Sequence, residues 1–159
     1  MMVEKKEKYG VEMKISQEGK ALIKKFEGCE LESYQDSVGV WTIGFGHTKG
    51  VKEGMVWSQS HAEDMLEVEL EEYENYINDL VDVPLKQCQF DSLTSWVYNL
   101  GPSNLISSTL LVKLNSSLYE DIPHEIQRWN KAGGEVLEGL IRRRKAEALL
   151  FEGKDWSEV

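Results

Sequence analysis

The sequence predicts an α+β protein that is mostly helical, with a small β-hairpin lobe near the N-terminus and a larger helical body. Three observations support this. One β-prone segment follows a short first helix, apolar residues recur at helical spacing over most of the later chain, and 159 residues suit one globular domain or two small lobes. A hairpin lobe beside a helical body leaves a cleft between the two parts, where a polymer can lie.

The first helix is expected to begin after Ser16 and to end at Gly28. Serine commonly caps a helix N-terminus, and Glu18 falls in the first turn, where the helix dipole favours negative charge. Glycine is typical of the position just past a helix C-terminus. Glu27 is therefore expected in the last turn of this helix.

The segment 34–48 has the pattern of a β-hairpin. Residues 36–39, Asp-Ser-Val-Gly, are a turn signal between β-prone flanks, and a strand is expected over residues 40–47. Its glycines, Gly44 and Gly46, permit a bulge or a close approach of the backbone to another group. We expect no other β region in the chain.

The chain after Gly54 is expected to be helical. Apolar residues from Leu66 to Leu80 recur with the helical period, and Pro84 ends that helix. Four further segments are expected as helices: 88–100, 109–118, 122–130 and 137–151. A loop is expected at residues 132–134, before the last of these helices.

These elements give one domain over residues 15–153. The β-containing lobe is expected at about residues 30–60 and the helical body at about 61–153. Residues 1–14 are polar and aperiodic and are expected to form a tail, as are residues 154–159.

Composition excludes several classes of protein. The formal net charge of −10 argues against a nucleic-acid binder, because such proteins present a basic face to phosphates. No run of about 18 apolar residues occurs, so we expect no membrane insertion, and residues 1–14 lack the apolar core of a secretory signal. Cys29 and Cys88 are too few for a disulfide framework, so free thiols are expected, with one pairing after export left open. Metal-type spacing is absent, and we expect no metal and no cofactor.

Glu27 and Asp36 are the first candidates for chemistry. A glycosidase needs two carboxyl groups flanking the bond it cuts, one protonated and one ionised. The negative end of the first helix disfavours the charged form of Glu27, and contact with Phe26 or Trp41 would add to this effect. Asp36, in a polar turn with backbone amides nearby, is expected to stay ionised. Because the chain holds 28 Asp and Glu residues, two solvated surface carboxylates are the simpler alternative for any such pair taken alone.

The neighbouring motifs make the pair specific. Asp36 lies nine residues after Glu27, and Thr42 lies six residues after Asp36 and opens the run Thr-Ile-Gly-Phe-Gly-His. This pattern resembles the signature of the phage-type lysozymes. The resemblance covers residues 15–153 and continues through these segments: 90–93, 98–101, 108–111, 113–115, 129–134, 139–140 and 142–147.

The resemblance implies roles for three residues. Glu27 matches the proton donor, Asp36 the second carboxylate, and Thr42 the hydroxyl beside the attacking water. An inverting hydrolysis fits this set best, with Asp36 and Thr42 orienting a water on the face opposite Glu27. A course with Asp36 as nucleophile stays open at the level of sequence.

Further residues are assigned by the same resemblance. Thr48, Tyr98 and Thr109 match positions that line the sugar groove, with simple packing as the alternative. His47 is expected to act structurally within the hairpin lobe. The basic run at residues 142–145 is expected either to form a solvated helix face or to face anionic glycan.

The resemblance also implies a substrate and a setting. It predicts an endolysin, a monomer that hydrolyses the β-1,4 bond between N-acetylmuramic acid and N-acetylglucosamine in peptidoglycan glycan strands and so lyses the host cell. It predicts accumulation in the host cytoplasm until a separate holin opens the membrane. Alternatives are a non-catalytic cell-wall glycan-binding module on the same scaffold, a structural or regulatory phage component, and a chitinase-like specificity. The acidity of the chain departs from many relatives and argues against simple electrostatic capture of the wall.

Overall fold

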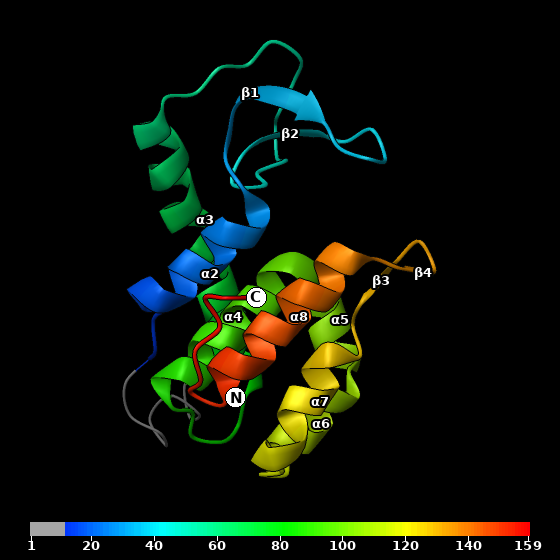
Figure 1. Ribbon diagram of the computed structural model, residues 1–159. Helices are drawn as coiled ribbons and strands as arrows, with labels where there is room; N and C mark the ends of the chain where they lie inside the picture. Colours follow the sequence, from blue (N-terminus) through cyan, green and yellow to red (C-terminus); the bar gives the residue numbers. More distant parts are fainter. Residues whose placement is uncertain (1–11) are drawn as a thin grey trace.

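The computed structural model describes residues 12–159 and has two lobes (Figure 1). The smaller lobe contains strands β1 (Glu30–Gln35) and β2 (Trp41–Gly44). The long helix α3 (Gln59–Leu80) runs from this lobe into the larger one, which consists of packed helices. The expected mostly helical α+β class is confirmed.

The β lobe is built on an antiparallel hairpin. Tyr34 pairs with Thr42, and a tight turn joins β1 to β2. The expected strand over residues 40–47 ends early, at Gly44, because the chain folds back on itself there. Ile43 and His47 exchange two backbone hydrogen bonds of 2.9 Å across this second turn. Gly44 and Gly46 have φ angles of 67° and 81°, which residues with a side chain rarely adopt, so these glycines allow the turn.

Helix α2 (Gln17–Glu27) has the expected position, with Ser16 before it and Gly28 after it. The side chain of Ser16 does not cap the helix. Its hydroxyl instead donates to Oδ2 of Asp91, and its backbone N–H donates to Oδ1 of Asp91 at 2.9 Å. Ser16 therefore ties the start of α2 to the centre of the helical body.

Helix α4 (Gln87–Leu100) is the central element of the larger lobe. It is buried from Gln89 to Val97, and the helices α2, α3 and α8 (Glu138–Phe151) pack around it. Trp96 of α4 is fully buried and meets the ring of Trp129 edge-on. Removal of this apolar surface from water is the main source of the lobe's stability.

The region between α4 and α8 differs most from the expectations. A helix that the sequence analysis missed, α5 (Pro102–Ser107), begins at Pro102, because proline is well suited to the first turn of a helix. The expected helices at 109–118 and 122–130 are shorter. The observed elements are α6 (Thr109–Asn115), the 3-10 turn η1 (Tyr119–Asp121) and α7 (Ile122–Gln127).

The expected loop at residues 132–134 is the turn of a second hairpin, so the expectation of a single β region was wrong. Strands β3 (Lys131–Ala132) and β4 (Glu135–Val136) pair antiparallel around Gly133 and Gly134. Both glycines have positive φ, as short hairpin turns require.

Met13 and Trp156, which fall within the two expected tails, pack against the helical body. Residues 1–11 lie outside the described part of the structure. Met13 packs against the core, and its N–H donates to Asn78 at 3.0 Å. Near the C-terminus, Trp156 is 8% exposed in a cluster that contains Leu22 and Leu150. Within residues 12–159, no helix is both long and apolar enough to cross a membrane.

Candidate active site

Glu27 is held between the two lobes. It is the last residue of α2, and its side chain is 18% exposed. From the helical body, Nη1 of Arg143 donates to Oε2 of Glu27 at 2.7 Å. From the β lobe, the backbone of Gly46 comes so close that an added Cβ would lie 2.6 Å from Oε1. Any residue with a side chain at position 46 would therefore collide with the Glu27 carboxyl group in its observed position.

The ion pair changes the expected electrostatics of Glu27. The sequence placed this carboxyl at the negative end of a helix, which favours its protonated form. The structure adds the positive charge of Arg143 directly beside this carboxyl. Phe26 lines the same pocket as Glu27, whereas Trp41 is not among the residues that line it.

The charge of Glu27 affects the pKa values of three tyrosines. Burial raises the pKa values of Tyr34, Tyr73 and Tyr98, and the negative charge of Glu27 contributes to each rise. The charge of Asp36 also acts on Tyr34, so Tyr34 senses both candidate carboxylates. At neutral pH these three tyrosines are uncharged and contribute only their dipoles to the site.

Asp36 is fixed by the turn of the first hairpin. Its Oδ1 accepts hydrogen bonds from the N–H groups of Val38 at 2.9 Å and Val40 at 2.8 Å. Within residues 12–159, the Asp36 side chain makes no other hydrogen bond. Its second oxygen, Oδ2, is therefore left for a water molecule or a sugar.

Thr42 is linked to Asp36 through Val40. The hydroxyl of Thr42 donates to the carbonyl of Val40 at 2.9 Å, and the N–H of Asp36 donates to that same carbonyl at 2.9 Å. Thr42 is 5% exposed. The hairpin therefore presents a carboxylate and a hydroxyl oxygen as one rigid unit.

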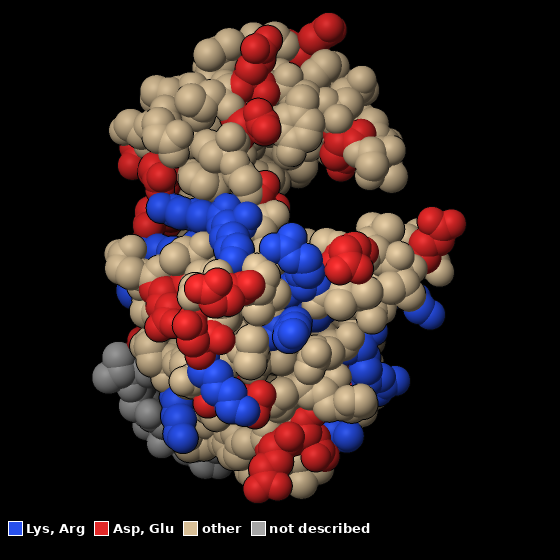
Figure 2. Space-filling model, in the orientation of Figure 1, with Lys and Arg blue, Asp and Glu red and all other residues tan. Residues whose placement is uncertain are grey.

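A pocket of about 450 Å³ contains Glu27 at its wall. It lies among α2, the end of α4 and the start of α8, and it is lined by the basic residues Lys25, Arg142 and Arg143. Figure 2 shows the deep notch between the lobes; on the face shown, Lys and Arg occur on the helical body and not on the upper lobe. An acidic chain thus offers a locally cationic wall beside Glu27.

The other predicted site residues are not brought into this pocket. Thr48 is exposed on the β lobe. Tyr98 donates its hydroxyl to the carbonyl of Phe45 at 2.7 Å, which joins α4 to the β lobe. Thr109 lines a second pocket of about 420 Å³, together with Arg128 and Trp129. Contact of Thr48, Tyr98 and Thr109 with a glycan stays a prediction.

His47 occupies a structural position. Its Nδ1 lies 2.5 Å from Oε1 of Glu69 on α3, and its ring packs against the ring of Trp57. These contacts support the interpretation that His47 holds the β lobe on α3.

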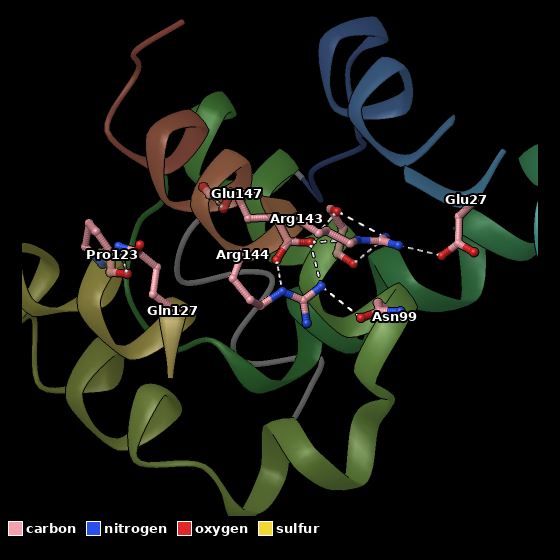
Figure 3. Close-up of polar contacts among 9 residues, drawn as sticks. Glu27, Asn99, Pro123, Gln127, Arg143, Arg144 and Glu147 are labelled. Atoms are coloured by element: carbon pink, nitrogen blue, oxygen red, sulfur yellow. Dashed lines mark hydrogen bonds and ion pairs between the residues drawn. The ribbon is translucent and has the colours of Figure 1, made fainter. Parts of the chain in front are cut away.

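Sequence analysis missed the buried charges behind Glu27. The run 142–145 was expected to be a solvated face or a glycan-facing surface, yet Arg143 and Arg144 are buried and pair with the buried Glu147 (Figure 3). The available signal was the spacing: Glu147 lies four residues after Arg143 and three after Arg144, on one side of a helix.

A two-lobed, mostly helical α+β fold with a notch between the lobes (Figure 1 and Figure 2) is the architecture of a lysozyme-type glycoside hydrolase. Comparisons with known proteins agree. The family model described as phage lysozyme matches residues 24–147. The chain therefore belongs to the phage lysozyme family.

Curated relatives are endolysins of phages. The endolysin of Acyrthosiphon pisum secondary endosymbiont phage 1 is 42% identical over 144 residues, which cover 88% of this chain and 99% of the relative. The endolysin of Bacillus phage B103 is 40% identical over 142 residues, and these span 87% of this chain but only 54% of that longer protein.

Solved structures show the same fold. The muramidase domain of SpmX from Asticcacaulis excentricus aligns with a TM-score of 0.81 at 36% identity and covers 87% of this chain and 97% of that chain. A mutant of P22 lysozyme aligns with a TM-score of 0.78 at 36% identity and covers 88% of this chain and 99% of that chain.

Proposed function

We propose that this protein is an endolysin that hydrolyses the β-1,4 bond between N-acetylmuramic acid and N-acetylglucosamine in peptidoglycan. The observation that carries the proposal is the placement of Glu27 in a chain of the phage lysozyme family. Glu27 is held between the lobes by Arg143 and by the backbone of Gly46. Asp36 lies in the hairpin turn of the β lobe with its Oδ2 left for a water molecule. Two carboxyl groups, one on each lobe, are what a glycosidase requires.

In the proposed mechanism, Glu27 protonates the glycosidic oxygen as the C–O bond breaks. Asp36, through its free Oδ2, takes a proton from a water molecule that Thr42 helps to orient, and this water attacks the anomeric carbon from the opposite face. The products are a reducing sugar end and a free hydroxyl, and the two carboxyl groups have exchanged protonation states. Proton exchange with solvent then restores both, since Glu27 gains a proton and Asp36 loses one.

A retaining course is the alternative, with Asp36 attacking the anomeric carbon itself. The fixed position of Asp36 in the hairpin turn is compatible with both the inverting and the retaining mechanism. The anomer formed first decides between them and can be followed by proton NMR of a short glycan during hydrolysis: inversion supports Asp36 as base, and retention supports it as nucleophile.

The proposed setting is lysis of a bacterial host by a monomer. We propose that the protein accumulates in the host cytoplasm and reaches the glycan strands after a separate holin opens the membrane. The endolysin names of its relatives support this role. Time-lapse imaging with and without a co-expressed holin tests it, since lysis without the holin would contradict the proposed route.

The enzyme is tested on walls stripped of outer membrane, by loss of turbidity and release of reducing ends. Wild type is compared with Glu27→Gln and with Glu30→Gln, an exposed glutamate on β1 that serves as control. We expect Glu27→Gln to lower the rate by at least about 10²-fold, because general acid catalysis contributes that much. Glu30→Gln is expected to match wild type.

The same preparation tests the glycan-binding alternative. If wild type and Glu27→Gln both sediment with walls and neither releases reducing ends, the protein is a binding module. Comparison of chitin with peptidoglycan as substrate separates a chitinase-like specificity from the proposed one.

A further inference from the structure

A fully buried carboxylate stands behind the Glu27–Arg143 pair. Glu147 of α8 is 0% exposed. Its Oε2 accepts from the hydroxyl of Ser95 at 2.6 Å and from Nε of Arg143 at 3.2 Å, and its Oε1 lies 2.7 Å from Nε of Arg144. The hydroxyl of Ser92 donates to its backbone carbonyl at 2.6 Å. Burial of a carboxylate is costly unless opposite charges lie beside it, and Glu147 has two arginines next to it. Among residues 12–159 the hydrogen bonding is incomplete, because Oε1 of Glu147 and both Nε and Nη1 of Arg144 make no hydrogen bond, so the Arg144 contact is an ion pair.

Arg143 is shared between Glu147 and Glu27. Its Nε donates to Glu147, its Nη1 donates to Glu27, and its Nη2 donates to the carbonyl and the hydroxyl of Ser95 at 3.3 Å each. All three nitrogens are thus engaged, and the planar guanidinium has one orientation. Figure 3 shows Arg143 extended between the two carboxylates.

The charges of the cluster balance only when Glu147 is included. Arg143 and Arg144 carry two positive charges, and Glu147 cancels one of them. Glu27 therefore faces one net positive charge rather than two. Arg144 connects this charged cluster to the pocket that contains Glu27. Its Nη2 donates to Oδ1 of Asn99, a residue that lines the pocket, at 2.9 Å.

We infer that Glu147 is a positioning residue for the reaction: through Arg143 it fixes the carboxyl of Glu27, and by cancelling one positive charge it lets Glu27 hold the proton that it must donate. The inference rests on the proposed function of Glu27 as acid. An arginine that paired with Glu27 alone would hold it in the ionised form, which cannot protonate a leaving group.

In the described part of the chain, Arg143 is the charged side chain that contacts Glu27. Tyr34, Tyr73 and Tyr98, on β1, α3 and α4, are within range of the charge of Glu27 and are neutral. Glu30 acts on Tyr34 and Glu69 acts on Tyr73 and Tyr98, without contacting Glu27, and Arg142 lines the same pocket. On α2, Lys24 pairs with Glu63, and Lys25 donates to the carbonyls of residues 157 and 159. Asp36 acts with Glu27 on Tyr34 but belongs to the opposite lobe.

The test compares the pH dependence of kcat for wild type, Glu147→Gln and Glu147→Asp on a soluble glycan. Glu147→Gln keeps the shape and removes the charge. We expect the alkaline limb of its kcat profile to move down by about one pH unit, with a roughly tenfold lower kcat above that limb and an unchanged KM. Glu147→Asp, which restores the charge, is expected to return the limb toward its wild-type position.

Glu74→Gln is the matched control. Glu74 is a buried carboxylate of α3, 8% exposed, that accepts from the N–H of Ile15 at 2.7 Å. Its neutralisation is expected to lower the melting temperature without moving the limb. A limb that moves equally in Glu74→Gln would show a general effect of lost stability and overturn the inference.

A second variant covers the case in which Glu147→Gln does not fold. Asn99 is exposed, so Asn99→Asp adds a negative charge beside Arg144 at little structural cost. We expect the alkaline limb to move up, opposite to Glu147→Gln. A folded Glu147→Gln with a wild-type profile, or an unmoved limb in Asn99→Asp, overturns the role of Glu147 while the proposed hydrolysis stands. Absence of cleavage by wild type overturns the proposed function itself, and this role with it.

Discussion

Gly46 determines how closely the β lobe approaches the candidate acid. Its φ of 81° suits glycine, and an added Cβ would lie 2.6 Å from Oε1 of Glu27. We expect Gly46→Ala to displace the carboxyl and lower kcat by roughly 10²-fold, because small displacements of a catalytic group are costly.

Gly134→Ala is the control for this substitution. Gly134 has a φ of 82° but open space around the position of a Cβ. Alanine at either glycine is expected to cost about 1–2 kcal/mol of unfolding free energy from backbone strain. Only Gly46→Ala is expected to lose activity, and equal kcat values for the two variants would contradict the proposed placement of Glu27.

At the scale of single residues, the sequence indicated the candidate side chains at the pocket and in the hairpin turn. It did not indicate the buried charged residues that hold Glu27 in place. Glu27, Asp36 and Thr42 are joined by fixed gaps in a short motif, so a linear pattern marks them as candidates. Arg143 and Glu147 lie in a charged helical segment, where the same spacing is typical of solvated surface pairs. Only tertiary packing decides that this side of α8 is buried.

At the scale of elements, the C-terminal segment stabilises the helical body. Trp156 packs with Leu22, Ala146 and Leu150, and its indole N–H donates to Glu18 of α2 at 3.1 Å. We expect Trp156→Ala to lower the unfolding free energy by about 3 kcal/mol, as for other large-to-small substitutions in a core. Urea denaturation measures this loss.

Val112→Ala provides the comparison for Trp156→Ala. Val112 is 67% exposed on α6, so its truncation is expected to change stability by less than about 0.5 kcal/mol. A loss below about 1 kcal/mol for Trp156→Ala would show that the segment after α8 is only loosely attached.

Strong local signals predicted the elements well, and weak ones did not. Ser16 and Gly28 flank α2 as expected, whereas α3 ends at Leu80, four residues before Pro84, which was expected to end it. The helix expected over residues 88–100 ends at Leu100 as expected, but Pro102 then begins α5, which the sequence analysis did not predict. The hairpin at residues 131–136 has strands of two residues each, which are too short for an alternating pattern to appear.

At the scale of the whole molecule, ion pairs make the stability depend on pH. Although burial alone would raise the pKa of Glu125, hydrogen bonds from Lys113 and Arg128 lower it below its ordinary value. A lowered pKa in the folded state means that the unfolded chain binds the proton more readily. The contribution of Glu125 is therefore present at neutral pH and is lost as the pH falls through its folded pKa.

Urea denaturation between pH 7 and pH 3 tests this dependence. We expect the unfolding free energy of wild type to fall more steeply below about pH 5 than that of Glu125→Gln, which cannot titrate there. Parallel curves for the two proteins would contradict a role of Glu125 in acid sensitivity.

Besides α3, two contacts attach the β lobe to the helices. The hydroxyl of Tyr98 donates to the carbonyl of Phe45, and His47 contacts the carboxylate of Glu69 on α3. The sequence predicted the lobes and the cleft, since hairpin and helical patterns occupy separate stretches of chain. It could not predict these links, because each joins residues that lie more than 20 positions apart and carry no shared pattern.

The proposed reaction is hydrolysis at the muramic acid side of the glycan bond. Its most direct test is digestion of purified peptidoglycan in water enriched in oxygen-18, followed by mass spectrometry of the soluble fragments. We predict fragments that end in reducing N-acetylmuramic acid with one oxygen-18 at the anomeric carbon. Fragments that end in anhydro-muramic acid without the label, or peptides released from intact glycan strands, would contradict it.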